Sequence, residues 1–267
     1  MFGNMLRIVT IKTVSYPRWL VLAVFLLIFG VSYSSPTIIL AENKNLFSRP
    51  QQAQLFQLIR QYIRENPEII LEALETIQTR EEIAQEEQQR RQVRLHKKTI
   101  EDSPEDPILG NPEGSVTVVE FFDYQCGYCK NMLRVLLEAI NRNDDVKVIL
   151  KEYPILGPVS MTAAQASLAA QYQNKFKIFH TSLMLLKGRI SEAAIFQVAK
   201  EVGLDVNRLA KDMESSEVLD KLRKNRELGQ QLLIRGTPAL IIDDKISPGA
   251  LTLPKLEKLI SESRKRN

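Results

Sequence analysis

The chain has 267 residues, of which 44% are hydrophobic and 25% are charged, as in an ordinary globular protein with one core and an extension. This composition excludes a disordered chain and a membrane protein with many spans. The formal net charge is +4, but residues 1–41 contain three basic residues and no acidic residue, so the rest of the chain carries only +1. A nearly neutral chain gives no support to nucleic-acid binding.

Residues 1–41 contain a short apolar segment behind a basic flank. Residues 19–31 (WLVLAVFLLIFGV) form an apolar core of 13 residues, which suits a signal peptide better than a membrane span of about 20 residues. Candidate cleavage sites end at Ser34 or Ala41, and neither has the Ala-x-Ala pattern. The segment is therefore predicted to be a signal peptide or an N-terminal membrane anchor. The rest of the chain is expected outside the cytoplasm, in a bacterial periplasm or cell envelope.

Residues 42–105 have a helical pattern. One helix is expected from about Gln51 to Glu65, and Asn66-Pro67 indicates the start of a longer one. The first half of the longer helix has apolar residues near heptad spacing, whereas residues 81–98 are almost entirely charged or Gln. Two interpretations of this helical arm remain open: a solvated spacer, and an oligomerisation region whose apolar stripe needs a partner.

Residues 106–267 are predicted to form one α/β domain, whose first part is a linker that ends near Ser115. An apolar strand (VTVVEFFDY) then leads directly into Cys-Gly-Tyr-Cys and a helical segment. Residues 146–153 alternate as a second strand. The strand–helix–strand order predicts that these two strands are parallel.

Residues 158–233 show no strand pattern and are predicted to be a helical insertion. Its helices are expected at about 160–173, 175–187, 192–202 and 205–233, with a break in the last near Gly229. A short strand (239–242), a partner strand (245–247) and a closing helix (253–263) follow. The order describes an α/β thioredoxin fold with a helical insertion, preceded by an N-terminal α-helical arm.

Cys126 and Cys129 are the only two cysteines. A single pair excludes a disulfide-rich scaffold and cannot complete a four-cysteine zinc site. His96 and His180 lie far away in the sequence, and each is expected on a helix surface rather than as a metal ligand. The first cysteine is placed at a helix N-terminus, where free N–H groups stabilise a thiolate. The second lies within reach of it, so the pattern predicts a dithiol redox site.

Three stretches, FFDYQCGYCK, KEYPILGP and Gly236-Thr237-Pro238, resemble the DsbA-like branch of the thioredoxin superfamily. The resemblance covers about Asp106 to the C-terminus and implies an exported thiol–disulfide oxidoreductase that needs no cofactor. The helical arm is similar to that of oligomeric relatives such as DsbC and the copper-tolerance protein ScsC. A homo-oligomer formed through the N-terminal helices is therefore expected.

The resemblance also implies roles for individual residues. Cys126 is expected to be the exposed nucleophile and Cys129 the resolving thiol. Thr237-Pro238 resembles the loop in which the family holds a cis proline beside the disulfide and binds an extended substrate. Gly127 and Tyr128 lie between the cysteines and are expected to contact the substrate.

Glu120 lies six residues before Cys126 on the predicted strand. Alternation with Phe121 points its side chain inward, and the family has an acidic residue at the matching place. A buried carboxylate has a raised pKa and is expected to accept the proton of Cys129 during resolution.

The expected substrates are secreted or envelope proteins with cysteines, and an external redox partner protein is needed because the chain has no further cysteine. The Gly-Tyr pair adds no charge that would stabilise the thiolate, which argues against a strong oxidant. Oxidase, isomerase and reductase directions stay open. Two alternatives are a Cu(I)-binding envelope protein that uses both thiolates and a structural, surface-anchored protein.

Overall fold

The computed structural model describes residues 47–266, and the predicted signal or anchor segment at 1–41 lies outside the described residues. The described chain divides into two compact units, one up to Pro67 and one from Glu68 onward. The first unit contains α2 (Arg49–Glu65), and this helix has no buried residue. Among residues 47–266, no helix is both long enough and apolar enough to cross a bilayer.

The second unit is built around a five-stranded sheet with the order β1-β3-β2-β4-β5. The strands are β1 (Ile108–Gly110), β2 (Val116–Phe122), β3 (Val146–Glu152), β4 (Ala239–Ile242) and β5 (Lys245–Pro248). β2 and β3 are parallel, as the sequence predicted, and the other neighbouring pairs are antiparallel. β2 and β3 are almost entirely buried, as expected for parallel strands that helices cover on both faces.

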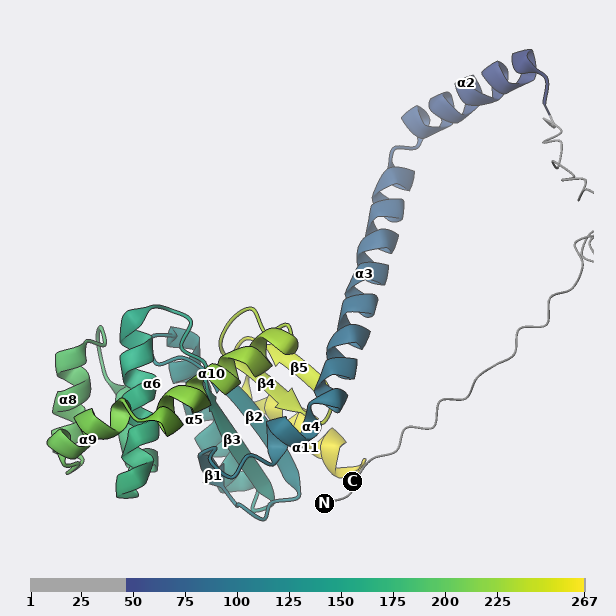
Figure 1. Ribbon diagram of the computed structural model, residues 1–267. Helices are drawn as coiled ribbons and strands as arrows, with labels where there is room; N and C mark the ends of the chain where they lie inside the picture. The colour runs from purple at the N-terminus through teal and green to yellow at the C-terminus, as the bar shows by residue number, and fades with distance from the viewer. Residues whose placement is uncertain (1–46, 267) are drawn as a thin grey trace, which may run out of the picture. The chain divides into compact units, whose positions relative to one another are not determined.

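The helices lie on both sides of this sheet (Figure 1). They are α3 (Glu68–Leu95), α4 (Lys97–Glu101), α5 (Gly127–Arg142), α6 (Pro158–Ala170), α7 (Phe176–Leu185), α8 (Glu192–Glu201), α9 (Val206–Met213), α10 (Ser216–Gln231) and α11 (Leu253–Arg264). The larger core cluster joins one sheet face to α5, α11 and the helices of the insertion. A smaller cluster on the opposite face contains Val93 of α3, Ile100 of α4 and Leu228 of α10. The α/β thioredoxin fold with a helical insertion and an N-terminal helical region is therefore confirmed.

Two details of the prediction were wrong. The expected linker before Ser115 contains β1, an edge strand of three residues that is too short to show an alternating pattern. The helix expected at 205–233 is two helices, α9 and α10, separated near Ser215. Gly229 does not break α10. This residue lies inside the helix. A glycine fits there because a Cβ atom would come within 2.5 Å of the Tyr153 ring.

Candidate functional site

Cys126 caps the N-terminus of α5, directly after the turn that follows β2. Its N–H donates to the carbonyl of Asp123 at 3.1 Å, and its own carbonyl accepts from Lys130 N at 3.2 Å. The helix therefore starts at the sulfur-bearing residue, where unpaired N–H groups favour negative charge. Both thiols are free in this structure.

The structure corrects the expectation that Cys126 is exposed, because only 7% of its surface is accessible. Its Sγ donates to the carbonyl oxygen of Thr237 at 3.1 Å, so the loop before β4 covers it. The Thr237-Pro238 peptide bond is cis, as the resemblance implied. Residues 111 positions apart in the sequence therefore meet at the sulfur.

Cys129 lies one helical turn further along α5 and is completely buried. Burial raises the pKa of its thiol, and the nearby carboxylate of Glu120 raises this pKa further. Cys129 also lies within hydrogen-bonding reach of Cys126. The two cysteines therefore differ. Cys126 lies at the helix N-terminus, whereas the surroundings of Cys129 disfavour its thiolate form.

Glu120 occupies the centre of β2, where it is opposite Leu150 of β3 and Leu240 of β4. The side chain is 1% exposed, and its Oε1 has no hydrogen-bond partner among the described residues. Burial raises the pKa of this carboxyl group to about 8. The inward orientation predicted from alternation is therefore confirmed, and Glu120 can hold or release a proton near neutral pH.

Gly127 and Tyr128 are the accessible part of the motif, and Tyr128 is 70% exposed. A Cβ atom at Gly127 would meet no other atom within 4 Å. The residues predicted to form the site thus meet around one sulfur pair, with Gly127 and Tyr128 facing solvent and Glu120 inside. The roles assigned to them stay predictions.

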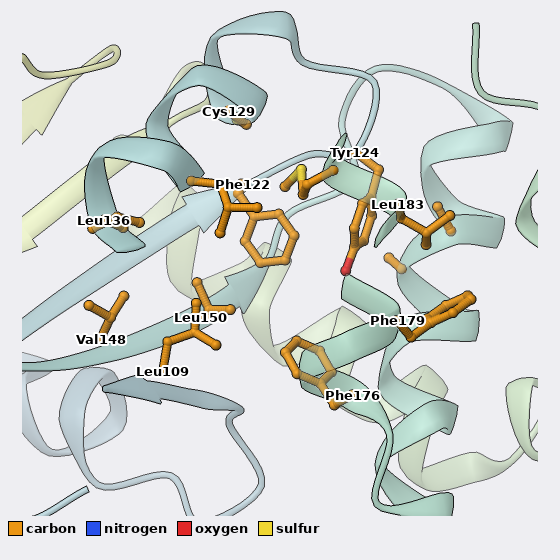
Figure 2. Close-up of a cluster of buried hydrophobic side chains, with 14 of the residues drawn as sticks. Leu109, Phe122, Tyr124, Cys129, Leu136, Val148, Leu150, Phe176, Phe179 and Leu183 are labelled. Carbon is orange, nitrogen blue, oxygen red and sulfur yellow. The ribbon is translucent and has the colours of Figure 1, made fainter. Parts of the chain in front are cut away.

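Sequence reasoning missed a buried polar network next to the site. The Tyr124 hydroxyl lies 2.5 Å from Ser167 Oγ and 2.8 Å from His180 Nδ1, and it donates to Glu152 Oε1 at 3.1 Å. Figure 2 shows the Tyr124 hydroxyl pointing toward α7, the helix that contains Phe176 and Phe179. Burial raises the pKa of Tyr124 and of Glu152.

The expectation that His180 lies on a helix surface was wrong. His180 is completely buried, stacks on Phe176 at a centroid distance of 5.3 Å and is neutral because burial lowers its pKa to about 3. His96 is partly buried at the start of α4. Within the part of the chain that the structure describes, no cluster of three or more His, Cys, Asp or Glu residues has metal-binding geometry.

Asp123 is another residue that the sequence analysis did not single out. It is 1% exposed and follows β2 directly. Its carboxylate accepts hydrogen bonds from Gln125 N, Ile155 N, Leu156 N and Ser160 Oγ at distances of 2.6 to 2.9 Å. An acidic residue between a strand and the cysteine motif was the available signal, but three of its four partners, in Ile155, Leu156 and Ser160, are more than 30 residues away in the sequence.

The β2–α5–β3 unit, the antiparallel β4–β5 pair and the cysteine pair covered by a proline loop define a thioredoxin-fold dithiol protein. A family model for the DSBA-like thioredoxin domain matches residues 117–261, and the chain belongs to this family. Residues 51–84, in α2 and the first half of α3, match the N-terminal domain of the copper resistance protein ScsC.

Solved structures agree with this assignment. The chain is similar to a thioredoxin-like oxidoreductase from Silicibacter pomeroyi DSS-3, with 39% identity and a TM-score of 0.62, over 63% of this chain and 97% of that one. It is also similar to Proteus mirabilis ScsC in a transitional conformation, with 30% identity and a TM-score of 0.62, over 83% of this chain and 100% of that one.

Two kinds of curated protein are among the relatives of this chain. The probable disulfide bond formation protein D of Bacillus anthracis is 28% identical over 152 residues, which are 52% of this chain and 70% of that protein. The Na(+)/H(+) antiporter NhaA 1 of Mycobacterium sp. (strain KMS) is 24% identical over 168 residues, or 61% of this chain. The chain spans only 27% of the antiporter's length.

Proposed function

We propose that the chain is an exported thiol–disulfide oxidoreductase that oxidises or isomerises cysteine pairs of secreted or envelope proteins. One observation carries this proposal: the Cys126 thiol, at the N-terminus of α5, donates to the Thr237 carbonyl at 3.1 Å while Cys129 lies buried one turn inside. Such an arrangement allows an incoming sulfur to reach only the outer cysteine. Membership of the DSBA-like family and the relative named as a disulfide bond formation protein support it.

In the oxidising direction, the reaction starts from a Cys126–Cys129 disulfide. A client thiolate attacks Cys126 Sγ, which forms a mixed disulfide and releases Cys129 as a thiolate. The carboxyl group of Glu120, protonated below a pKa of about 8, is the nearby proton donor for this sulfur. A second client thiolate then attacks the client sulfur of the mixed disulfide and releases Cys126. The client loses two electrons and two protons, and the protein gains two thiols.

Isomerisation uses the same intermediate from the reduced state. The Cys126 thiolate attacks a client disulfide, and a different client thiolate later displaces Cys126, so no net electrons move. Oxidation needs a disulfide-bearing redox partner that returns the protein to its oxidised form, whereas isomerisation needs a dithiol-bearing redox partner that keeps the protein reduced. The exposed, uncharged Gly127 and Tyr128 leave both directions available.

The test uses the protein that begins at residue 42, with two assays: oxidation of a reduced client with glutathione disulfide as the oxidant, and refolding of a client with scrambled disulfides. We expect turnover in at least one. Cys126→Ser should abolish it, whereas Cys129→Ser, with the scrambled client, should accumulate a mixed disulfide visible by non-reducing electrophoresis. Inactivity in both assays with both cysteines intact would contradict the proposal, and so would full activity of Cys126→Ser.

We also propose that the N-terminal helices join copies of the chain. Large apolar side chains on α2 and the first part of α3 face solvent in the single chain: Leu55, Phe56, Leu58, Ile59, Tyr62, Ile63, Ile70, Leu71, Leu74 and Ile77. α2 buries none of its residues, and α3 buries only Val93. A second copy would cover such a surface.

Cu(I) binding is a second candidate, supported by the two free thiols and by the match of residues 51–84 to a domain of a copper resistance protein. Soft thiolate ligands suit Cu(I). A titration with Cu(I) under anaerobic conditions tests it. Stoichiometric Cu(I) binding that is lost in Cys126→Ser would favour this candidate. If the protein binds no Cu(I), thiol–disulfide exchange is the function that the site supports.

A further inference from the structure

Basic residues gather on two segments next to the cysteine motif. Residues 124–137, which include the first turns of α5, contain Lys130 and Arg134 and no acidic residue. Residues 153–191 contain four basic residues and again no acidic residue. The chain from residue 42 onward carries only +1 in total, so its remaining residues are net acidic. Charge is therefore segregated within a chain that is nearly neutral as a whole.

A hydrogen bond joins the two segments. Lys130 directly follows Cys129, and its Nζ donates to the carbonyl of Leu186 at 3.1 Å. Leu186 is the C-cap of α7, which packs against α5. The loop that follows it contains Lys187 and Arg189. The first turns of α5 and this loop therefore lie side by side.

The four basic side chains of this region lack an acidic partner. Arg134 lies one turn after Lys130, so both are on the same side of α5. Arg134, Lys187 and Arg189 are exposed, and Lys130 is partly buried against an uncharged carbonyl. Between residues 47 and 266, no carboxylate forms an ion pair with any of the four. We call Lys130, Arg134, Lys187 and Arg189 the basic patch.

The basic patch lies close to the reactive sulfur. Cys126 caps α5, and Lys130 and Arg134 follow it at about 6 and 12 Å along the helix axis. A client cysteine bonded to Cys126 brings its own neighbours close, since an extended chain advances about 3.3–3.6 Å per residue. Client residues about two to four positions from that cysteine can therefore reach the basic patch.

Resting on the proposed function, we infer that the basic patch binds acidic side chains that flank the reactive cysteine of the protein that Cys126 attacks. A carboxylate of the bound segment supplies the negative charge that the patch lacks in the single chain. Exposed charges speed the encounter of two proteins more than they strengthen the complex. The patch thus selects which cysteines react fast, next to a motif whose Gly127 and Tyr128 carry no charge.

The experiment uses the reduced full chain and three peptides whose single cysteine is a 2-pyridyl disulfide flanked by Glu, Gln or Lys. The Cys126 thiolate attacks the peptide sulfur and releases 2-thiopyridone, and Cys129 then displaces the peptide. The protein loses two electrons and two protons, and the peptide thiol and 2-thiopyridone gain them. The absorbance of 2-thiopyridone gives the rate constant. Rates with 2-mercaptoethanol, an uncharged thiol, correct for the intrinsic reactivity of each peptide.

After this correction, the wild-type protein should react about tenfold faster with the Glu peptide than with the Lys peptide at low ionic strength. The Gln peptide should lie between them. The preference should fall to about twofold or less in about 1 M salt, where the Debye length is about 3 Å. Lys187→Glu/Arg189→Glu should reverse the order of the peptides, and Lys187→Gln/Arg189→Gln should remove most of the preference.

A matched variant controls for the change in net charge. Lys200→Glu/Lys211→Glu alters the charge by the same amount at exposed positions of α8 and α9 that lie outside the basic patch. This variant should keep the wild-type order of the peptides. Circular dichroism and thermal melts establish that each variant is folded.

Equal corrected rates for the three peptides at low ionic strength would overturn the inference. An unchanged Glu preference in Lys187→Glu/Arg189→Glu would overturn it as well. If this variant slows all three peptides by the same factor, the patch acts on the Cys126 thiolate and not on the client. Failure of the proposed function looks different, because the reduced wild-type protein would then react with no peptide faster than 2-mercaptoethanol does.

Discussion

The carboxylate of Glu120 raises the pKa of the Cys129 thiol when it is charged, and both groups are buried. Burial alone raises the pKa of Glu120 to about 8. The unfolded chain binds fewer protons at this position than the folded chain between pH 4.5 and 8, so the free energy of unfolding falls across this window. The contribution of protonated Glu120 to the free energy of unfolding is greatest below pH 4.5 and is lost as the pH rises to 8.

The variant Glu120→Gln should therefore gain stability relative to the wild-type protein as the pH increases. The difference in unfolding free energy should grow by at most about 1.4 kcal/mol per pH unit between 4.5 and 8 and stay constant below 4.5. Urea denaturation at several pH values measures it. A difference that does not depend on pH would show that Glu120 is ionised in the folded protein throughout this range.

Glu120→Gln should also slow the step in which Cys129 exchanges its proton. General acid–base groups contribute about a hundredfold or more to such steps, so we expect a drop of at least tenfold in kcat. The wild-type rate should change with pH near 8, and this change should disappear in the variant. Stopped-flow measurement of mixed-disulfide resolution is the readout. A pH profile with the same inflection in both proteins would exclude Glu120 as the proton carrier.

The buried carboxylate of Asp106 forms ion pairs with Lys151 and Lys221, which are themselves buried. Asp106→Asn leaves two buried ammonium groups without an anion, so it should destabilise the protein by about 3–5 kcal/mol. The loss should shrink at high pH, because burial lowers the pKa of Lys151 and Asp106 opposes this shift. Asp220→Asn is the matched control, since its partner Arg223 is exposed, and should cost less than about 1 kcal/mol.

The close contact between Gly229 and Tyr153 predicts a cost for a larger side chain. Gly229→Ala should destabilise the protein by about 1–3 kcal/mol through overpacking, although alanine favours helices by about 1 kcal/mol. The double variant Gly229→Ala/Tyr153→Leu should recover part of the loss because the ring that the new Cβ would meet is absent. Thermal melts of the two variants measure this recovery. Equal melting temperatures would argue against a steric clash between the introduced Cβ atom at position 229 and the Tyr153 ring.

The apolar side chains of the N-terminal helices predict self-association. Light scattering on the chain that begins at residue 42 should give a mass that is a multiple of the single-chain value. Phe56→Ser/Ile59→Ser should lower it, whereas Ile178→Ser/Leu219→Ser, at similarly exposed positions in the insertion, should not. A single-chain mass for the unmodified protein would favour the solvated-spacer interpretation of the arm.

Local patterns were sufficient for much of the fold and of the site. The strand before Cys126, the helix after it and the inward side chain of Glu120 follow from alternation and from the position of the motif. The Thr237-Pro238 loop was found through resemblance, because no local pattern brings it to a sulfur 111 positions away.

Features that depend on tertiary packing were missed. The burial of His180 depends on Tyr124 and Phe176, and the cover over Cys126 depends on Thr237. The role of Asp123 depends on N–H groups at Ile155 and Leu156, whose positions only the folded chain defines. In each case the residue type was visible in the sequence, but its partner was not.

The packing of Val93 and Ile100 against the second face of the sheet has a practical consequence for truncation. The family match begins at residue 117, but a gene fragment starting there would lack these two side chains and all of β1. It would expose Phe121 and Ile241 to water and invite aggregation. Shortened expression products that retain the catalytic half should therefore begin upstream of Val93, within the solvent-exposed part of α3.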